Sequence, residues 1–215
     1  MKESNRPPGL ILAGGRSRRM GREKSLVKLC GITLLQRSLE RFRPQVGPLA
    51  LSANGDPARF AAFGLPVMAD QSTQNQGPLA GLLAGLSWAS RLQEQPHHIA
   101  TVPCDTPFFP ADLVRRLRKE LAAKADAHAD KIALPASNGR LHPAFGLWPL
   151  SLTEDLRQWL DSGERRVQDW LARHDPLIVE FSLIRRKGEI IDPFFNINHK
   201  SDLEKAEKNC QALEK

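Results

Sequence analysis

The sequence contains no tyrosine, three cysteines and no long apolar run. Without tyrosine and without an RNP-like motif, the stacking aromatics of an RNA-binding surface are not evident, although the formal charge of +7 favours an anionic partner. No apolar segment approaches the roughly 20 residues that span a bilayer, and residues 1–8 lack the apolar core of a signal peptide. We therefore expect a cytoplasmic protein that binds neither a membrane nor nucleic acid.

The cysteines are Cys30, Cys104 and Cys210, and they lie far apart in the sequence. No Cys-x-x-Cys and no paired histidine spacing is present, which argues against a zinc site and favours a reducing compartment. Cys104 directly precedes Asp105 and is a candidate nucleophile. A small buried residue at the end of a strand is the favoured interpretation.

Two common phosphate-binding motifs are missing near the N-terminus. Gly15 and Gly21 are separated by five residues where a Walker A loop needs four, and the adjacent Gly14 and Gly15 do not fit Gly-x-Gly-x-x-Gly. A short apolar strand over residues 10–13 instead runs into this glycine pair, which permits a sharp turn. Backbone N–H groups and cations then converge, which predicts an anion site, with a solvated basic face as the alternative. The cations are Arg16, Arg18, Arg19, Arg22 and Lys24.

Short apolar runs alternate with amphipathic helices along the chain, which is typical of βαβ units. At 215 residues and 41% hydrophobic composition, the chain is long enough for one core and short for two. We expect a single α/β domain over residues 1–215, with a Rossmann-like, doubly wound, mostly parallel sheet flanked by helices. The predicted strands are 10–13, 48–54, 65–70, 99–102, 132–135 and 143–148. The predicted helices are 33–43, one from Pro78, 112–124, and two announced by capping boxes at Ser151 and Ser201.

Polar residues follow three of the predicted parallel strands. Asn54, Asp70 and Asp105 each stand just past the carboxyl end of a strand, where open α/β sheets bind ligands. An amide and a carboxylate suit a base edge or a sugar hydroxyl, and carboxylates together with substrate phosphates suit Mg²⁺. For each residue alone, a turn or a cap is the alternative.

The ordered set of motifs resembles the molybdenum cofactor guanylyltransferases of the MobA family. The opening motif is shared by many nucleotidyltransferases, whereas the whole set, from Leu10 to about Leu203, is much more specific. The motifs are Leu12-Ala-Gly-Gly-Arg-Ser-Arg-Arg-Met-Gly21 with Lys24, Ser52-Ala-Asn54, Met68-Ala-Asp70, Gly77-Pro-Leu-Ala-Gly81, Pro103-Cys-Asp-Thr-Pro107, Gly163-Glu-Arg-Arg-Val167 and Phe195-Asn-Ile-Asn198.

The resemblance implies that the terminal phosphate of molybdopterin attacks the α-phosphorus of GTP, with Mg²⁺ bound, to give the guanine dinucleotide cofactor and pyrophosphate. It also implies transient contacts with molybdate-insertion proteins and molybdoenzyme chaperones. The N-terminal half would bind the nucleotide and the C-terminal half the acceptor. The implied nucleotide-binding residues are Leu12, Ala13, Gly14, Gly15, Lys24, Asn54, Asp70 and Asp105. The implied catalytic residues are Lys24, Arg19 and Asp105, of which Asp105 would hold Mg²⁺. The implied acceptor residues are Gly77, Gly81, Arg165, Asn196 and Asn198.

The sequence departs from the family pattern before His142, where Leu141 replaces a frequent acidic residue, so a role of this loop in substrate binding stays open. The tryptophans could stack on a pterin, but core packing is the favoured interpretation. Two other functions remain as alternatives. One is a cytidylyl or sugar-phosphate nucleotidyltransferase of the same fold. The other is a non-catalytic nucleotide-binding regulator, which is disfavoured because Lys24 and Asp105 are both present.

Overall fold

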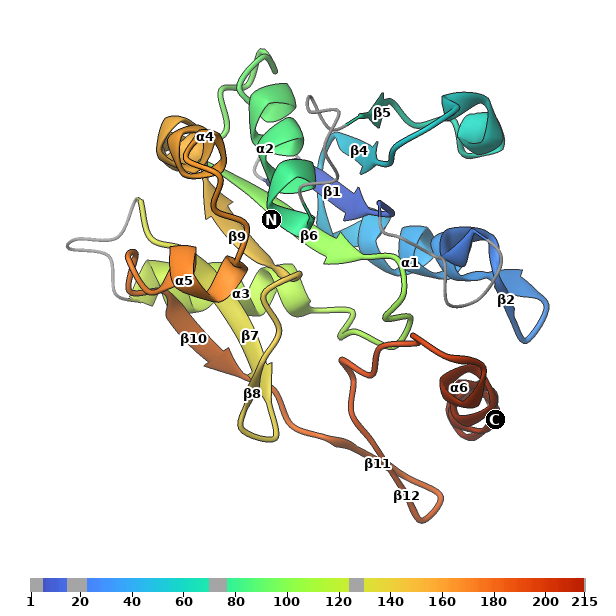
Figure 1. Cartoon of the computed structure of the whole chain (residues 1–215). Coiled ribbons are helices and arrows are strands. Elements are labelled where there is room, and N and C mark those ends of the chain that lie inside the picture. The colour runs from blue at the N-terminus through green and yellow to red at the C-terminus, as the bar shows by residue number, and fades with distance from the viewer. Residues whose placement is uncertain (1–5, 15–22, 70–76, 124–129, 215) are drawn as a thin grey trace.

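The structure is a computed structural model that describes residues 6–14, 23–69, 77–123 and 130–214. An eight-stranded sheet forms its centre, in the order β10-β7-β9-β6-β1-β4-β5, with β8 paired to β7 (Figure 1). Strand β1 pairs in parallel with both β4 and β6. The pairs β4–β5 and β7–β10 are also parallel. Strand β9 is antiparallel to β6 and β7. The predicted α/β fold with a mostly parallel sheet and flanking helices is confirmed.

The elements are close to the predicted ones in the first half of the chain. The sheet contains β1 (Gly9–Leu12), β4 (Leu49–Ser52), β5 (Val67–Met68), β6 (His98–Pro103), β7 (Ala133–Ser137), β8 (Arg140–Leu141), β9 (Gly146–Pro149) and β10 (Leu177–Glu180). Two hairpins lie outside it, β2 (Lys28–Leu29) with β3 (Ile32–Thr33) and β11 (Ile184–Arg186) with β12 (Glu189–Ile191). The α-helices are α1 (Leu34–Phe42), α2 (Pro78–Ala89), α3 (Leu113–Ala123), α4 (Thr153–Asp161), α5 (Val167–Leu171) and α6 (Lys200–Glu214), and the 3₁₀ helices are η3 (Lys24–Leu26), η4 (Arg43–Gln45), η5 (Pro57–Phe63) and η6 (Leu150–Leu152).

Two hydrophobic cores cover the two faces of the sheet, because successive side chains of a strand point to opposite faces. Ile11 of β1 packs in the core formed with α1 and α3, and the neighbouring Leu10 packs in the core formed with α2, α4 and α5. Both side chains are fully buried. In the part of the chain that the structure describes, no helix is both long and apolar enough to cross a membrane.

Helix α2 lies very close to the sheet because two of its residues are glycines. A Cβ atom on Gly85 would lie 2.3 Å from Leu10 Cδ2, and a Cβ atom on Gly81 would lie 2.6 Å from Ser52 Oγ. Both distances are well below van der Waals contact, so these positions require glycine unless the helix moves. The helix begins at Pro78, as the sequence predicts.

The helices expected after the two capping boxes are present, but neither serine caps its helix. Ser151 lies in η6, one turn before α4, and donates to Asp130 Oδ1 at 2.7 Å. At α6 the N–H groups of Asn198 and His199 donate to Asp202 Oδ2 at 2.9 and 2.8 Å. Asp202 is the third residue of the helix, so its carboxylate accepts from the backbone that precedes the helix, and the expected role of Ser201 was wrong.

Candidate active site

Four side chains meet at the carboxyl edge of the sheet, around the ammonium group of Lys24. Lys24 Nζ lies 2.5 Å from Asp105 Oδ2, 2.8 Å from Asn198 Oδ1 and 3.3 Å from Asn196 Oδ1. The side chains of Lys24 and Asp105 are 17% and 18% exposed, so a ligand can reach them. The structure thus brings together two residues proposed for catalysis and two proposed for the acceptor.

Asp105 is held by the end of β6 and by the asparagine loop. The preceding residue, Cys104, donates its N–H to the carbonyl of Leu12 at 3.1 Å, which ties this strand end to the end of β1. Ile197 N donates to the carbonyl of Asp105 at 2.9 Å, and Thr106 Oγ1 donates to Asp105 Oδ1 at 3.2 Å. The backbone of Asp105 therefore fixes the loop that presents both asparagines.

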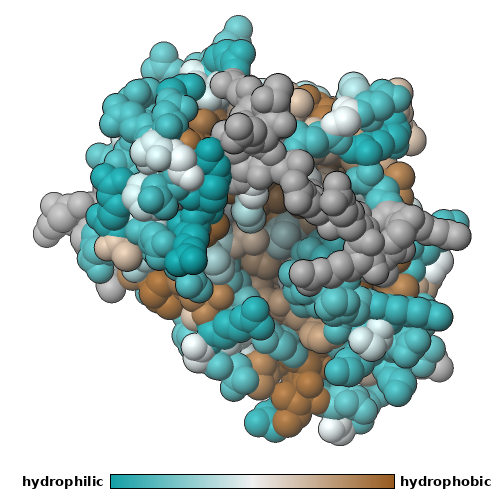
Figure 2. All heavy atoms as spheres, viewed as in Figure 1, coloured by the Kyte–Doolittle hydropathy of each residue, from teal (hydrophilic) through white to brown (hydrophobic). Residues whose placement is uncertain are grey.

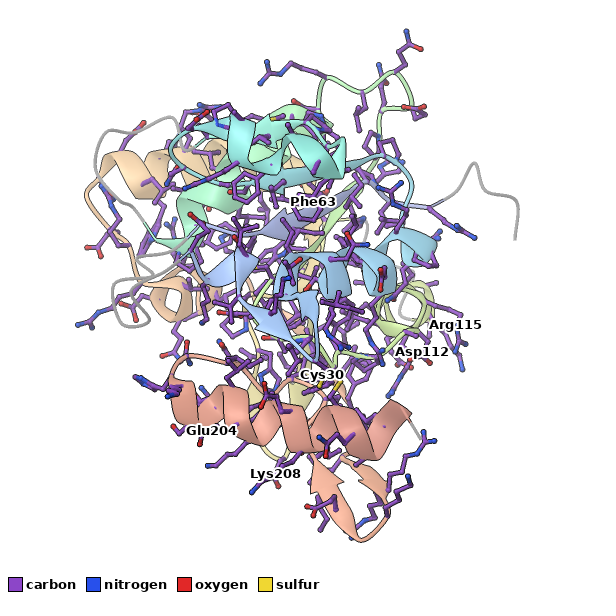
Figure 3. All side chains as sticks on the ribbon, turned by 90° about the vertical axis from the view of Figure 1, so that its right-hand side faces the viewer. Cys30, Phe63, Asp112, Arg115, Glu204 and Lys208 are labelled. Carbon is purple, nitrogen blue, oxygen red and sulfur yellow. The ribbon has the colours of Figure 1, made fainter. Side chains whose placement is uncertain are left out.

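A third, smaller core supports both sides of the Lys24 cluster. Ile197 is fully buried against Leu29 of β2 and against Ala206 and Cys210 of α6. Figure 3 shows Cys30, next to Leu29, directly beside α6. Since Leu29 closely follows Lys24 in the chain, α6 supports the lysine segment and the asparagine loop through the same core.

The proposed nucleotide-binding residues that the structure describes lie at the same edge of the sheet. Ala13 N donates to the carbonyl of Ser52 at 2.8 Å, and Ala53 N donates to the carbonyl of Met68 at 3.0 Å, so β1, β4 and β5 end side by side. The chain leaves the sheet at Gly14, and Asn54 follows the end of β4. The face in Figure 2 is hollowed near its centre, beside the end of β6, with apolar side chains on its floor. The other candidates, Gly15, Arg19 and Asp70, lie outside the described residues.

The structure shows no contact of Gly77, Gly81 or Arg165 with the Lys24 cluster among the described residues, and each has a feature of its own. Gly77 precedes α2 with a φ of +72°. Gly81 faces Ser52, as described above, and also Leu12, whose Cδ2 would lie 3.3 Å from a Cβ atom on Gly81. Arg165 Nη1 donates to the carbonyls of Leu160 and Glu164, both at 2.6 Å, and so satisfies backbone groups at the end of α4. The close approach of Gly81 and the hydrogen bonds of Arg165 are structural roles, and Gly77 is favoured by its positive φ. A contact of these residues with the acceptor stays a proposal.

Cys104 is buried at the end of β6, as the sequence predicts. Its exposed fraction is 4%. Burial, together with the negative charge of Asp105, raises the pKa of the thiol far above its usual range. The protonated thiol is a poor nucleophile, so Cys104 acts as a packing residue.

The loop at His142 forms a hydrogen-bonded chain that sequence reasoning missed. Ser137 is fully buried, and its Oγ donates to Asp192 Oδ1 at 2.8 Å and lies 2.8 Å from His142 Nε2. Since the hydroxyl has one proton, Nε2–H of His142 is the donor of the second bond. Asp192 also accepts from Phe194 N at 2.9 Å, and the rings of His142 and Phe194 stack at 4.5 Å. This chain anchors the segment that leads to Asn196, and its members carry no recognisable motif.

Two tryptophans are confirmed as core residues. Trp148 and Trp170 are buried and stack with their ring centroids 6.0 Å apart. Their Nε1–H groups donate to Thr101 Oγ1 and Asp155 Oδ2, both at 2.7 Å. Both are therefore packed and hydrogen-bonded within the fold.

The chemistry available at this edge is charge neutralisation and positioning. A carboxylate and two amides surround the ammonium group of Lys24 at the ends of parallel strands, the edge at which ligands bind in such sheets. Transfer of a nucleotidyl group to a phosphate needs these functions more than it needs a protein nucleophile. The fold and this edge together define the chain as a nucleotidyltransferase.

Comparison with known proteins gives the particular family. The sequence matches the MobA-like NTP transferase domain over residues 9–177, and the chain belongs to this family. It is 47% identical to the molybdenum cofactor guanylyltransferase of Mesorhizobium japonicum, over 95% of this chain and 96% of that protein.

Two solved structures share the fold. Molybdopterin-guanine dinucleotide biosynthesis protein A from Archaeoglobus fulgidus superposes with a TM-score of 0.68 at 22% identity, over 95% of this chain and 98% of its own. A 4-diphosphocytidyl-2C-methyl-D-erythritol synthase from Anaerococcus prevotii has a TM-score of 0.70 at 12% identity, over 97% of each chain.

Proposed function

We propose that the chain transfers GMP from GTP to the phosphate of molybdopterin, with release of pyrophosphate. The observation that carries this proposal is the contact of Lys24 with Asp105, Asn196 and Asn198, because it joins the nucleotide end of the site to the C-terminal loop. The identity with a guanylyltransferase over nearly the whole chain supports the choice of nucleotide and acceptor.

The donor atoms around Lys24 fit a magnesium ion. Mg²⁺ prefers hard oxygen ligands, and it commonly takes one or two carboxylates together with water and substrate phosphates. Asp105 supplies a carboxylate, and Asn196 and Asn198 direct amide oxygens toward the same point. Within the described residues no group of three or more His, Cys, Asp or Glu gathers. When bound, the ion supplies charge stabilisation to the triphosphate.

The residues of the chain then act by position and charge. Lys24, with Arg19, neutralises the triphosphate and lowers the repulsion that an incoming phosphate meets. Asn196 and Asn198 orient the acceptor phosphate, an oxygen of which forms a bond to the α-phosphorus. The bond from the α-phosphorus to the bridging oxygen of the β-phosphate breaks, and pyrophosphate leaves. No protein group has to accept a proton from an acceptor that is already an anion.

The halves of the chain divide this work in the proposal. Leu12, Ala13 and Gly14 approach guanine through their backbone, Gly15 contributes to nucleotide binding, and Asn54 and Asp70 complete the recognition of the base. In the proposal, Arg165, Asn196 and Asn198 of the C-terminal half present the acceptor, together with Gly77 and Gly81 at the start of α2.

The test is pyrophosphate release from GTP, measured with and without molybdopterin, with mass analysis of the product. We expect release that depends on the acceptor and a product that contains one GMP per pterin. A chain that binds GTP but releases no pyrophosphate in the presence of molybdopterin would be a nucleotide-binding regulator instead.

A further inference from the structure

Arg59 connects two distant segments of the nucleotide side. It lies on η5, and its Nη1 is 2.5 Å from Glu23 Oε2. Its Nη2 donates to the backbone carbonyl of Asn54. One guanidinium therefore joins the residue before Lys24 to the residue proposed to recognise the base.

Glu23, the carboxylate partner of Arg59, holds the turn that carries Lys24. The carbonyl of Glu23 accepts from Leu26 N at 3.1 Å, so Glu23 is the residue from which η3 starts. Glu23 Oε1 also accepts from Ser25 Oγ at 3.3 Å, and Ser25 is fully buried. A displacement of Glu23 would therefore displace Lys24 as well.

The guanidinium itself is held in one place. Its Cζ lies 4.8 Å from the centre of the Phe60 ring, within the range of a cation–π contact. Gly55 lies beneath it with a φ of +89°, and a Cβ atom on Gly55 would be 3.4 Å from Arg59 Nη2. A Cβ atom at position 55 would be in van der Waals contact with the guanidinium, and the positive φ would strain the backbone of any residue but glycine.

The ion pair of Arg59 and Glu23 is too exposed to contribute much to the stability of the fold. The side chains of Arg59 and Glu23 are 32% and 27% exposed. Ion pairs at such positions contribute little to the free energy of unfolding. A fixed separation between two substrate-binding segments has a larger effect on the reaction than on stability. A misplacement of about 1 Å in a binding site can lower the rate on the order of 10²-fold.

We propose that Arg59 and Glu23 are positioning residues that set the distance between the base end and the phosphate end of the GTP site. This inference rests on the proposed function, since it takes Asn54 and Lys24 as the two ends of that site. Loss of either partner leaves both ends present but lets their separation vary. Affinity for GTP therefore falls, while affinity for the acceptor does not.

The experiment compares Arg59→Gln, Glu23→Gln and the double variant with wild type. The matched control is Arg115→Gln, which removes the ion pair from Arg115 Nη2 to Asp112 Oδ2 at 2.7 Å on the outer side of α3. Figure 3 shows this pair apart from Phe63, the last residue of η5. For each variant we would measure the GTP dissociation constant by calorimetry, KM for GTP and for molybdopterin, and the thermal unfolding midpoint.

We expect each single variant to weaken GTP binding about fivefold to tenfold, and the double variant to be no weaker than the worse single variant, because both changes remove one connection. KM for molybdopterin and the unfolding midpoint should stay at the values of Arg115→Gln. If Arg59→Gln unfolds, Glu23→Gln still tests the pair, since it leaves the contact with Asn54 intact. GTP affinity unchanged in both single variants, or independent effects that multiply in the double variant, would overturn the inference. A wild-type chain that binds no GTP would overturn the proposed function itself.

Discussion

The pair formed by Lys24 and Asp105 allows stability and catalysis to be separated. Each partner is removed in turn, by Lys24→Met and by Asp105→Asn, and both are removed in the double variant. Each single change leaves one group of the contact at 2.5 Å without its counterpart. The double variant leaves two uncharged side chains of similar size.

The magnitude follows from the exposure of the pair. Removal of one partner of a fully buried ion pair costs about 3–5 kcal/mol, and an exposed pair contributes about 0–1 kcal/mol. With side chains 17% and 18% exposed, we expect a loss of about 1–2 kcal/mol for each single variant. For a chain of this length, that loss lowers the unfolding midpoint by about 2–8 °C. The double variant should lose less than the sum of the two single losses, because no unpaired charge remains.

Catalysis should respond differently. All three variants should lose at least about 10²-fold in turnover, because the double variant restores packing but supplies neither the cation nor the carboxylate. The assays are thermal unfolding without nucleotide and pyrophosphate release with GTP and molybdopterin. Strictly additive stability losses would show that the pair is not coupled. Near-normal turnover of Asp105→Asn at ordinary Mg²⁺ concentration would remove Asp105 from the mechanism.

Three further predictions concern stability. Gly85→Ala should lower the free energy of unfolding by about 1–3 kcal/mol in urea titration, because its Cβ would lie 2.3 Å from Leu10 Cδ2, and an unchanged midpoint would contradict the close packing of α2. Ser137→Ala should cost about 1–3 kcal/mol in the same assay, because it leaves the N–H of His142 and the carboxylate of Asp192 without their shared partner; equal stability would mean that water replaces the hydroxyl. Burial lowers the pKa of His98 below its ordinary 6.5. As pH falls below 6.5, the unfolded chain therefore binds a proton at this histidine before the folded chain does, and the free energy of unfolding decreases. His98→Gln should therefore show a shallower fall of stability between about pH 6.5 and 5, and parallel curves would exclude this role for His98.

The strand ends at the site and the start of α2 could be predicted from the sequence, because local signals and the sheet topology agree there. Apolar runs followed by Asn54 and Asp105 predict strand ends at one edge of a parallel sheet, and both residues lie there. The glycines and Pro78 predict the start of α2, which begins at that proline. These signals are short-range, and the parallel sheet brings them together without further information.

Other features depend on turn geometry that the sequence analysis did not use. Asn138-Gly139 is a strong hairpin signal, and it connects β7 to β8 with φ values of 50° and 72°. Lys187-Gly188 connects β11 to β12 in the same way, with φ values of 52° and 81°. The Asn138-Gly139 hairpin could have been predicted from its residues. Lys187 is not a residue that favours a positive φ, so the second turn could not.

The contacts of Arg59 and Asp192 could not be predicted in this way. Arg59 meets Glu23 across 36 positions, and Ser137 meets Asp192 across 55. No local period or motif encodes such pairs, because they follow from how η5 and the loop before the asparagines pack on the finished sheet. Single charged residues of this kind are indistinguishable from solvated surface until the tertiary structure is known.

The choice of nucleotide tests the proposed function most directly. Guanine presents N1–H and N2–H₂ donors beside the O6 acceptor. In the proposed function these groups pair with the amide of Asn54, the carboxylate of Asp70 and the backbone of residues 12–14. A wrong base leaves about two buried polar groups unpaired, and each costs about 1–3 kcal/mol. This cost corresponds to a kcat/KM ratio between GTP and a wrong nucleotide on the order of 10² to 10⁴. The measurement is kcat/KM for GTP, ATP and CTP with molybdopterin as the acceptor. We expect GTP to exceed both others by that factor, and a CTP value equal to or above that of GTP would contradict guanylyl transfer.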